Sequence, residues 1–435
     1  MRQLEAAGWT CVHDPEEPKG EVCVINTCGF IGDAKEESIN MILQMAERKK
    51  KGKLRKLIVM GCLSERYRAE LEAEMPEVDE YFGKFDFLKI VESLKLNVER
   101  SSRVESCKWI ERKLTTPKHY AYLKISEGCN RMCSYCAIPL ITGRHTSRPM
   151  EEILDEVRWL VQQGVKEINV IAQDLSSYGL DLVKGQRDKV QSTKKHLLPE
   201  LIDQMAQIEG VEWIRLHYAY PTDFPEGLLD VMAKHKNVCK YLDIALQHCT
   251  DHMLGLMRRH ITRAEQDALI HKIRERVPGI CIRTTLLVGH PGETEEDFEE
   301  LKTWVKEMRF ERMGCFAYSD EEGTYANKHY KDDIPQEVKE RRVEELMAIQ
   351  QGISGELMQR LVGTVQRVVI DREEGEYLIG RTQFDSPEVD CEVLIKKLRV
   401  ESLELKEVEE LKVGEFYNVK ITKAEEFDLY GEIER

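Results

Sequence analysis

The first part of the chain has a pattern of apolar and polar residues that predicts a small parallel sheet. Short apolar runs at residues 21–28 and 56–62 are typical of strands, and the segment between them, from about residue 34 to residue 51, repeats apolar positions at helical spacing. A short helix stopped by glycine is predicted before them, at residues 1–9. Strand, helix and strand in this order indicate a parallel pair of strands.

The middle part alternates strand and helix patterns six times between residues 120 and 318. The predicted helices begin near residues 150, 198, 224, 263 and 294, and the predicted strands are residues 120–125, 167–171, 212–217, 241–246, 280–288 and 312–318. Six such units indicate an open (β/α)6 barrel, and barrels of this kind carry their chemistry at the carboxyl ends of the strands.

The last part changes to short strands after a helix at residues 336–361. The predicted strands are residues 363–371, 376–382, 392–394, 416–424 and 428–433. Strands this short and closely spaced indicate a small antiparallel barrel. The predicted fold class is therefore α/β, and the predicted parts are an N-terminal domain at 1–97, a linker at 98–118, a barrel at 119–335, a connecting helix at 336–361 and a C-terminal barrel at 362–435.

Composition and charge narrow the setting of the protein. The formal net charge of the 435 residues is −15, so the chain as a whole repels polyanions and favours a basic partner. We expect a cytoplasmic protein, because no apolar run is long enough to cross a membrane and the sequence shows no leader in which a charged segment is followed by an apolar one. In that setting the 13 cysteines indicate reduced thiols, some with a metal role. No coiled-coil pattern indicates assembly, so we expect a monomer.

Three cysteines follow the first barrel strand at C-x3-C-x2-C spacing: Cys129, Cys133 and Cys136. Thiolates this close can converge on one soft metal site. Zinc is the alternative, but a structural zinc site takes four ligands and His145 is the only other candidate close in sequence. A four-iron, four-sulfur (4Fe–4S) cluster held by three cysteines leaves one iron open to a substrate or cofactor. This spacing resembles the signature of radical S-adenosylmethionine (SAM) enzymes.

Two more cysteines, Cys28 and Cys62, occupy the same relative position, each at the carboxyl end of a predicted strand. Ligands bind at that edge in open α/β sheets, so the two thiols could share a metal. The alternative is that each is a small buried side chain, and spacing alone favours it because free cysteine is commonly buried.

Polar residues also follow the other strands of the predicted barrel. They are Gln173, Asp174, His217, Tyr218, Gln247, His248, Gly289 to Gly292, Tyr318 and Ser319. Each one alone could be a structural polar residue, but their shared position at one mouth of the barrel favours a functional site.

The order of these segments resembles the methylthiotransferase family of radical SAM enzymes over nearly the whole chain. The motifs that carry the resemblance are VINTCGFI at 24–31, GCL at 61–63, EGC through CAIP at 127–139 and VGHPGET at 288–294. Four stretches, at 171–174, 241–248, 318–324 and 380–390, are most similar to the members that modify an aspartate of small-subunit ribosomal protein S-twelve. The family organisation is an N-terminal cluster domain, a radical SAM barrel and a C-terminal TRAM barrel.

The resemblance implies two 4Fe–4S clusters and SAM as cofactors. The three cysteines of the C-x3-C-x2-C motif would hold the cluster that reduces SAM to a 5′-deoxyadenosyl radical, which can remove hydrogen from the unactivated β-carbon of the aspartate. Cys28 and Cys62 would help to hold the second cluster, which carries the sulfur to be inserted, and a second SAM would supply the methyl group. The candidates for binding SAM are Tyr135, Gln173, Gln247 and Arg283.

Two departures from the family pattern affect these expectations. Ala245 stands where the family has proline, a mild change. The family's first N-terminal cluster cysteine lies in a loop upstream of the helix with which this chain begins, so we expect a truncated chain or a misplaced start, and the second cluster is in doubt. Cys11 and Cys23 are the nearby substitutes, but Cys23 points to the opposite face of the strand that carries Cys28.

The charge of the C-terminal barrel indicates the macromolecular partner, and the missing cluster cysteine leaves alternative functions open. Residues 364–435 contain 19 acidic and 11 basic residues, so we expect this barrel to dock the basic ribosomal protein S-twelve. An electron donor is also needed. The alternatives are a tRNA methylthiotransferase, which would be expected to present a basic barrel, and a binding protein that keeps the fold without a competent second cluster.

Overall fold

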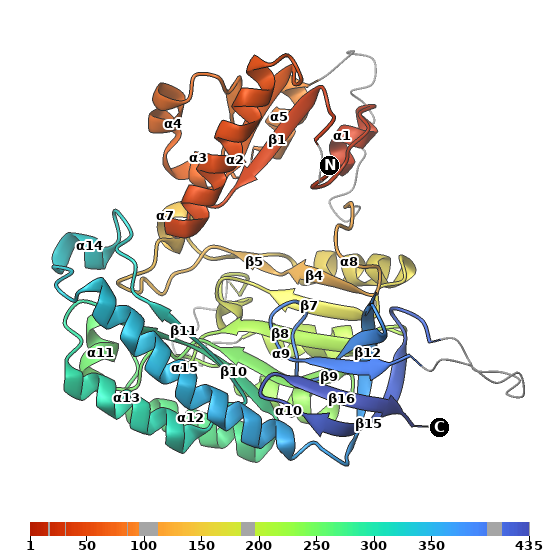
Figure 1. The fold of residues 1–435 in the computed structure, drawn as a ribbon, viewed down its shortest axis with the longest axis vertical. Helices are drawn as coiled ribbons and strands as arrows, with labels where there is room; N and C mark the ends of the chain where they lie inside the picture. Colours follow the sequence, from red (N-terminus) through yellow and green to blue (C-terminus); the bar gives the residue numbers. More distant parts are fainter. Residues whose placement is uncertain are drawn as a thin grey trace, which may run out of the picture. The chain divides into compact units, whose positions relative to one another are not determined.

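The computed structural model describes residues 1–15, 18–30, 32–84, 86–94, 112–183, 196–397 and 411–434. The chain forms two compact units (Figure 1). The N-terminal unit comprises residues 1–115 with two inserted segments, 128–144 and 319–330, and the barrel unit comprises residues 116–127, 145–318 and 331–435. The cysteine motif at 129–136 therefore belongs to the N-terminal unit, although it follows a barrel strand in sequence. Most of the predicted linker, residues 98–111, lies outside the described residues.

The N-terminal unit is built on a three-stranded sheet in the order β1-β2-β3 (Val22–Thr27, Lys56–Gly61 and Glu80–Tyr81), and both pairings are parallel. Buried Ile42 and Met45 of α2 (Gly32–Lys50) pack with Leu57 and Val59 of β2 to form its core. The predicted strand, helix and strand are confirmed. In the described part of this unit the other helices are α1 (Arg2–Ala6), α3 (Cys62–Arg66), α4 (Arg68–Glu74), α5 (Phe87–Ser93), α7 (Ile138–Thr142) and α14 (Tyr325–His329).

The barrel unit contains the predicted six-stranded parallel sheet, in the order β11-β10-β9-β8-β7-β4. Its strands are β4 (Tyr120–Lys124), β7 (Glu167–Ile171), β8 (Trp213–Ala219), β9 (Val238–Ile244), β10 (Cys281–Val288) and β11 (Arg312–Ala317). Among the described residues β4 and β11 are the two ends of this order, so the barrel is open as predicted. A short ribbon of β5 (Ser126–Glu127) and β6 (Thr146–Ser147) adjoins it.

Helices connect these strands. They are α8 (Met150–Gln162), the short 3-10 helix η2 (Leu175–Ser177), α9 (Leu198–Ala206), α10 (Gly227–Lys234), α11 (Asp251–Leu256), α12 (Arg263–Arg276) and α13 (Glu295–Met308). Capping boxes define two of their starts: Thr262 accepts from the backbone of Glu265, and Thr294 accepts from that of Asp297. The helix predicted near residue 294 therefore begins where its capping residue indicates.

The C-terminal barrel follows α15 (Gln336–Gln359), which packs on α13 and β11 (Figure 1). It is a closed five-stranded barrel of β12 (Val365–Glu374), β13 (Tyr377–Thr382), β14 (Glu392–Lys396), β15 (Phe416–Ala424) and β16 (Asp428–Ile433), in the order β12-β13-β14-β16-β15. The pair β14 and β16 is parallel, unlike the antiparallel arrangement predicted throughout. A closed ring with an odd number of strands must contain at least one parallel pair, because directions cannot alternate all the way round.

The C-terminal barrel covers the amino ends of the parallel strands. Trp213, Cys239 and Cys281, each at the start of its strand, pack in one buried cluster with Val369 of β12. The ring of Phe416 meets that of Trp213 edge-on, with centroids 4.8 Å apart. The carboxyl ends of the strands, where the sequence predicts the chemistry, are at the opposite end of the sheet. Within the described ranges, no helix combines the length and apolarity needed to span a membrane.

Candidate functional site

Cys28 and Cys62 lie at the same edge of the N-terminal sheet. The strands β1 and β2 pair in parallel with Thr27 opposite Gly61, and each cysteine is the first residue after its strand. Cys28 is exposed and Cys62 is half-buried. The alternative that both are small buried core side chains is therefore wrong.

Close backbone contact holds these two cysteine loops together. A Cβ atom on Gly29 would lie 2.7 Å from the backbone of both Cys62 and Leu63. Gly61, with φ +109°, approaches the carbonyl oxygen of Thr27 so closely that a Cβ atom would lie 2.5 Å away. Only glycine tolerates both restrictions without moving the loops apart.

The loop of residues 129–136 is closed by its own backbone hydrogen bonds. The N–H of Cys129 donates to the carbonyl of Gly143 at 3.2 Å, and that of Cys136 donates to the carbonyl of Cys133 at 3.2 Å. The N–H of Arg131 donates to Sγ of Cys129 at 3.4 Å. All three cysteines of the loop are half-buried. Partly accessible sulfur atoms with a backbone donor fit a soft metal cluster.

The N-terminal unit brings the two cysteine-bearing regions next to each other. Helix α3, which begins with Cys62, packs against α7, which begins two residues after Cys136. Among the described residues, no three His, Cys, Asp or Glu side chains are arranged to hold a metal ion. The structure therefore places all five predicted cysteine ligands in one unit without fixing a coordination geometry for them.

The suggested substitutes for cluster ligands have other surroundings. Cys23 packs against the core of the N-terminal sheet, and burial raises the pKa of its thiol. Burial also raises the pKa of Cys11. Cys23 is the second residue of β1, at the opposite end of the strand from Cys28. His145, the candidate fourth ligand for zinc, is buried in the barrel unit with Nε2 3.1 Å from Oγ of Ser147.

Two residues at the carboxyl ends of neighbouring barrel strands have left-handed backbone conformations. Tyr218 of β8 has φ +63° and Gln247, which follows β9, has φ +72°. The backbone of Gln247 bridges to β10, donating to the carbonyl of Thr285 at 2.9 Å and accepting from the N–H of Leu287 at 2.8 Å. Such conformations in residues other than glycine cost energy and concentrate at functional sites. Gln173, after β7, donates to Glu127 at 3.2 Å.

The candidate SAM-binding residues lie in both units. Tyr135 is in the N-terminal unit, and Gln173, Gln247 and Arg283 are in the barrel unit. The guanidinium of Arg283 pairs with Asp243 at 3.4 Å and with Asp390 of the C-terminal barrel at 3.3 Å. Arg283 is thus engaged with carboxylates of the barrel unit.

The histidines near the strand ends have hydrogen-bonding partners. Nε2 of His217 lies 3.2 Å from Oδ1 of Asn169, and that of His248 lies 3.2 Å from Glu293. Burial lowers the pKa of His217 to about 3 and that of His290 to about 4. His217 and His290 are therefore neutral at physiological pH and are buried polar groups of the barrel.

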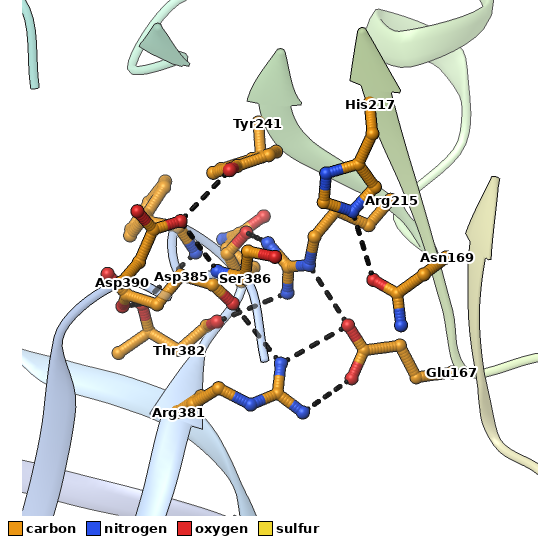
Figure 2. A network of polar contacts seen from close by, with 12 residues as sticks. Glu167, Asn169, Arg215, His217, Tyr241, Arg381, Thr382, Asp385, Ser386 and Asp390 are labelled. Atoms are coloured by element: carbon orange, nitrogen blue, oxygen red, sulfur yellow. Dashed lines mark hydrogen bonds and ion pairs between the residues drawn. The ribbon is translucent and has the colours of Figure 1, made fainter. Parts of the chain in front are cut away.

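Sequence reasoning missed a buried ionic network at the amino ends of the strands (Figure 2). Glu167 of β7 accepts from Arg215 of β8 at 2.9 Å and from Arg381 of β13 at 2.8 Å. Arg381 also pairs with Asp371 at 2.7 Å, and Asp371 lies 2.8 Å from Nε2 of His119. The available signal was the presence of charged residues inside apolar strand cores, which are rarely buried unless they are paired.

Comparisons with known proteins match the whole chain. Family models match residues 1–83 (uncharacterized protein family UPF0004), 123–305 (radical SAM superfamily) and 362–433 (TRAM domain). A ribosomal protein uS12 methylthiotransferase RimO from Phocaeicola vulgatus is 61% identical over 100% of this chain and 94% of its own length. One of the same name from Bacteroides thetaiotaomicron is 60% identical with the same coverage. The solved structure of TsrM, a radical S-adenosylmethionine methyltransferase from Kitasatospora setae, matches at 15% identity with a TM-score of 0.49, covering 69% of this chain and 64% of that one.

Proposed function

The chain belongs to the family of ribosomal protein uS12 methylthiotransferases RimO, and from this membership we propose that it replaces a hydrogen on the β-carbon of a uS12 aspartate by a methylthio group. The radical SAM and TRAM matches agree with the six-stranded barrel and the closed C-terminal barrel. The observation that carries the proposal is the adjacency of α3 and α7, because these helices flank the two sets of cysteines that this chemistry needs.

We assign the thiols of Cys129, Cys133 and Cys136 to the cluster that binds SAM. When bound, such a cluster supplies the electron that cleaves SAM. In this proposal the chain's own contribution is positional: the hydrogen bonds from Cys129 to Gly143 and from Arg131 to Sγ of Cys129 hold the loop in place. Tyr135, Gln173, Gln247 and Arg283 remain the proposed SAM contacts.

We assign Cys28 and Cys62 to a second cluster, the proposed site of the sulfur to be transferred. The glycine contacts between their loops support this assignment, because they hold the two thiols at one sheet edge. Which segment supplies the third thiolate of the family pattern is tested by measuring the iron content of this chain and of a version extended upstream. An iron content that rises with the extension would assign that ligand to the added segment.

We propose that uS12 docks on the acidic surface of the C-terminal barrel. Asp371, Asp385 and Asp390 do not contribute to that surface, because they pair with arginines inside the barrel unit. The remaining carboxylates include an exposed set on the last two strands: Glu425 and Glu426 in the turn between β15 and β16, and Glu432 and Glu434 at the far end of β16. Long-range attraction between this set and a basic protein would speed their encounter.

The decisive experiment supplies reconstituted protein with SAM, a reductant and either small ribosomal subunits or total tRNA. The expected product is a methylthio group on one aspartate of uS12, located by tandem mass spectrometry, with no modified tRNA nucleoside. Modified tRNA would instead support the alternative substrate. Tight uS12 binding with no transfer would support the reading of a binding protein with an incomplete second cluster.

A further inference from the structure

The segment of residues 319–330 contacts both cysteine-bearing regions of the N-terminal unit. The carboxylate of Glu321 is 4% exposed and accepts from Nζ of Lys35 at 2.7 Å and from Nη1 of Arg66 at 3.5 Å. Five residues further on, the N–H of Ala326 donates to the carbonyl of Ser134 at 2.7 Å. Ser134 lies between the second and third cysteines of the 129–136 loop. One short segment is thus attached to the N-terminal helices by a carboxylate and to that loop by its backbone.

The side chain of Arg66 connects this carboxylate to the loops of Cys28 and Cys62. Arg66 ends α3, the helix that begins with Cys62. Its guanidinium donates to the carbonyl of Gly29, the residue after Cys28, at 3.4 Å, and to the carbonyl of Glu322. Because a guanidinium offers several donors in a fixed plane, one residue can join both loops to the 319–330 segment.

The turn between Glu321 and Ala326 is itself fixed. Thr324 caps α14 by accepting from the N–H of Asn327 at 3.3 Å, and its hydroxyl donates to the carbonyl of Glu321 at 2.8 Å. The side chain of Asn327 accepts from the N–H of Gly323 at 3.1 Å. A displacement at Glu321 is therefore passed to Ala326 rather than absorbed between them.

We infer that Glu321 is a positioning residue that sets the separation of the two cysteine sites. It acts on the loops of Cys28 and Cys62 through Lys35 and Arg66. It acts on the 129–136 loop through the turn that begins α14. The inference rests on the proposed function, because transfer of a group between two sites depends steeply on their separation. It adds a role for three charged residues that neither bind a cofactor nor touch the substrate in the proposed scheme.

The first test uses thiol accessibility in the metal-free chain. Glu321→Gln removes the charge and keeps the shape, and Glu322→Gln is the matched control because Glu322 is the exposed next residue. We expect faster alkylation of Cys28 and Cys62 in Glu321→Gln than in the unaltered chain or the control, with each site followed by peptide mass spectrometry. Equal rates in the two variants would overturn the inference.

The second test separates positioning from general stability. In the reconstituted enzyme, Glu321→Gln should leave 5′-deoxyadenosine formation unchanged and lower the methylthiolated uS12 formed per 5′-deoxyadenosine roughly tenfold. Lys35→Met should lower this ratio less, since Arg66 still holds the carboxylate of Glu321. If Glu321→Gln does not fold, Lys35→Met takes its place in the test. A ratio that stays constant while both products fall would mean a merely structural role and overturn the inference. If the unaltered enzyme modifies no uS12, the proposed function fails, and the alkylation rates alone decide on Glu321.

Discussion

Glu167 of β7 and Arg381 of β13 form an ion pair of 2.8 Å in which both side chains are buried (Figure 2). The pair joins the six-stranded barrel to the C-terminal barrel, and Arg215 contacts the same carboxylate at 2.9 Å. Burial alone would raise the pKa of Glu167, but the charges of Arg381 and Arg215 outweigh it and lower that pKa to about 2. The carboxylate is therefore ionised at neutral pH and compensates two buried guanidinium groups.

Glu167→Gln is expected to destabilise the barrel unit strongly. It leaves Arg215 and Arg381 buried without their shared counter-charge, and breaking a buried pair in this way costs roughly 3–5 kcal/mol of unfolding free energy. The measurement is chemical denaturation of the whole chain, followed by circular dichroism.

Glu212→Gln provides the matched control for that measurement. Glu212 also lies on the six-stranded barrel side and pairs with an arginine of the C-terminal barrel, Arg367, at 2.6 Å. Both of those side chains are more than 40% exposed, so its loss should cost less than about 1 kcal/mol. Similar losses of unfolding free energy in Glu167→Gln and Glu212→Gln would show that burial does not set the strength of the Glu167 pair.

The sequence predicted the strands well because each is a short apolar run bounded by turns. The two residues of β3 form too short a run to give that signal, and its parallel pairing with β2 comes from the tertiary fold. The ionic network had to be seen in space, since Arg381 is 214 residues from Glu167. Periodicity locates an element, but it does not say which distant charge will face it.

His217→Gln is expected to flatten the pH dependence of stability in weak acid. The folded pKa of His217 is about 3 and its ordinary value is 6.5, so between these values the unfolded state binds a proton that the folded state does not. Stability therefore falls as pH drops from 6.5 towards 3, by up to about 1.4 kcal/mol per pH unit. Glutamine keeps a donor for Asn169 but cannot titrate.

The check is the unfolding free energy at several pH values between 4 and 7 for both proteins. His271→Gln serves as control, because His271 is exposed on α12. A slope as steep in His217→Gln as in the unaltered chain would show that another group carries this part of the acid sensitivity.

Single substitutions of cysteine should separate the two proposed clusters. Cys133→Ala should remove about four irons per chain and abolish SAM cleavage, since three thiolates are needed to hold that cluster. Cys62→Ala should keep SAM cleavage and lose transfer of the methylthio group. Iron content, 5′-deoxyadenosine and modified uS12 are measured on the same preparation.

Cys23→Ala is the control for those substitutions. Cys23 lies on β1, the strand that leads to Cys28, but its side chain packs against the core of the N-terminal sheet. We expect unchanged iron content with a modest loss of stability. A loss of iron in Cys23→Ala would make Cys23 a ligand and would contradict the assignment.

The sequence alone pointed to the candidate cysteines, but it did not point to the residues that support their loops. The cysteines stood out by their spacing and by their places after strands, which are local features. Glu321 lay within a stretch that resembles the family, yet its role depends on Lys35, which is 286 residues away in sequence. Supporting residues of this kind carry no spacing signal, because their geometry is set by the fold.

Neutralising the exposed acidic set of the C-terminal barrel should slow the binding of uS12. The variant carries glutamine at Glu425, Glu426, Glu432 and Glu434. Because these carboxylates act at long range, we expect a lower association rate at low salt, a smaller salt dependence and little change in the dissociation rate. Stopped-flow or surface-binding kinetics with isolated uS12 measures all three quantities.

A control with the same change in charge decides whether the effect is local. It carries glutamine at four exposed acids outside the C-terminal barrel: Glu275, Glu296, Glu337 and Glu344. If the two variants slow association equally, the net charge of the chain steers uS12 and the C-terminal barrel is not its docking site. If only the first variant is slow, the barrel provides the docking surface, and Asp385 and Asp390, which pair with Arg312 and Arg283, serve its attachment to the six-stranded barrel.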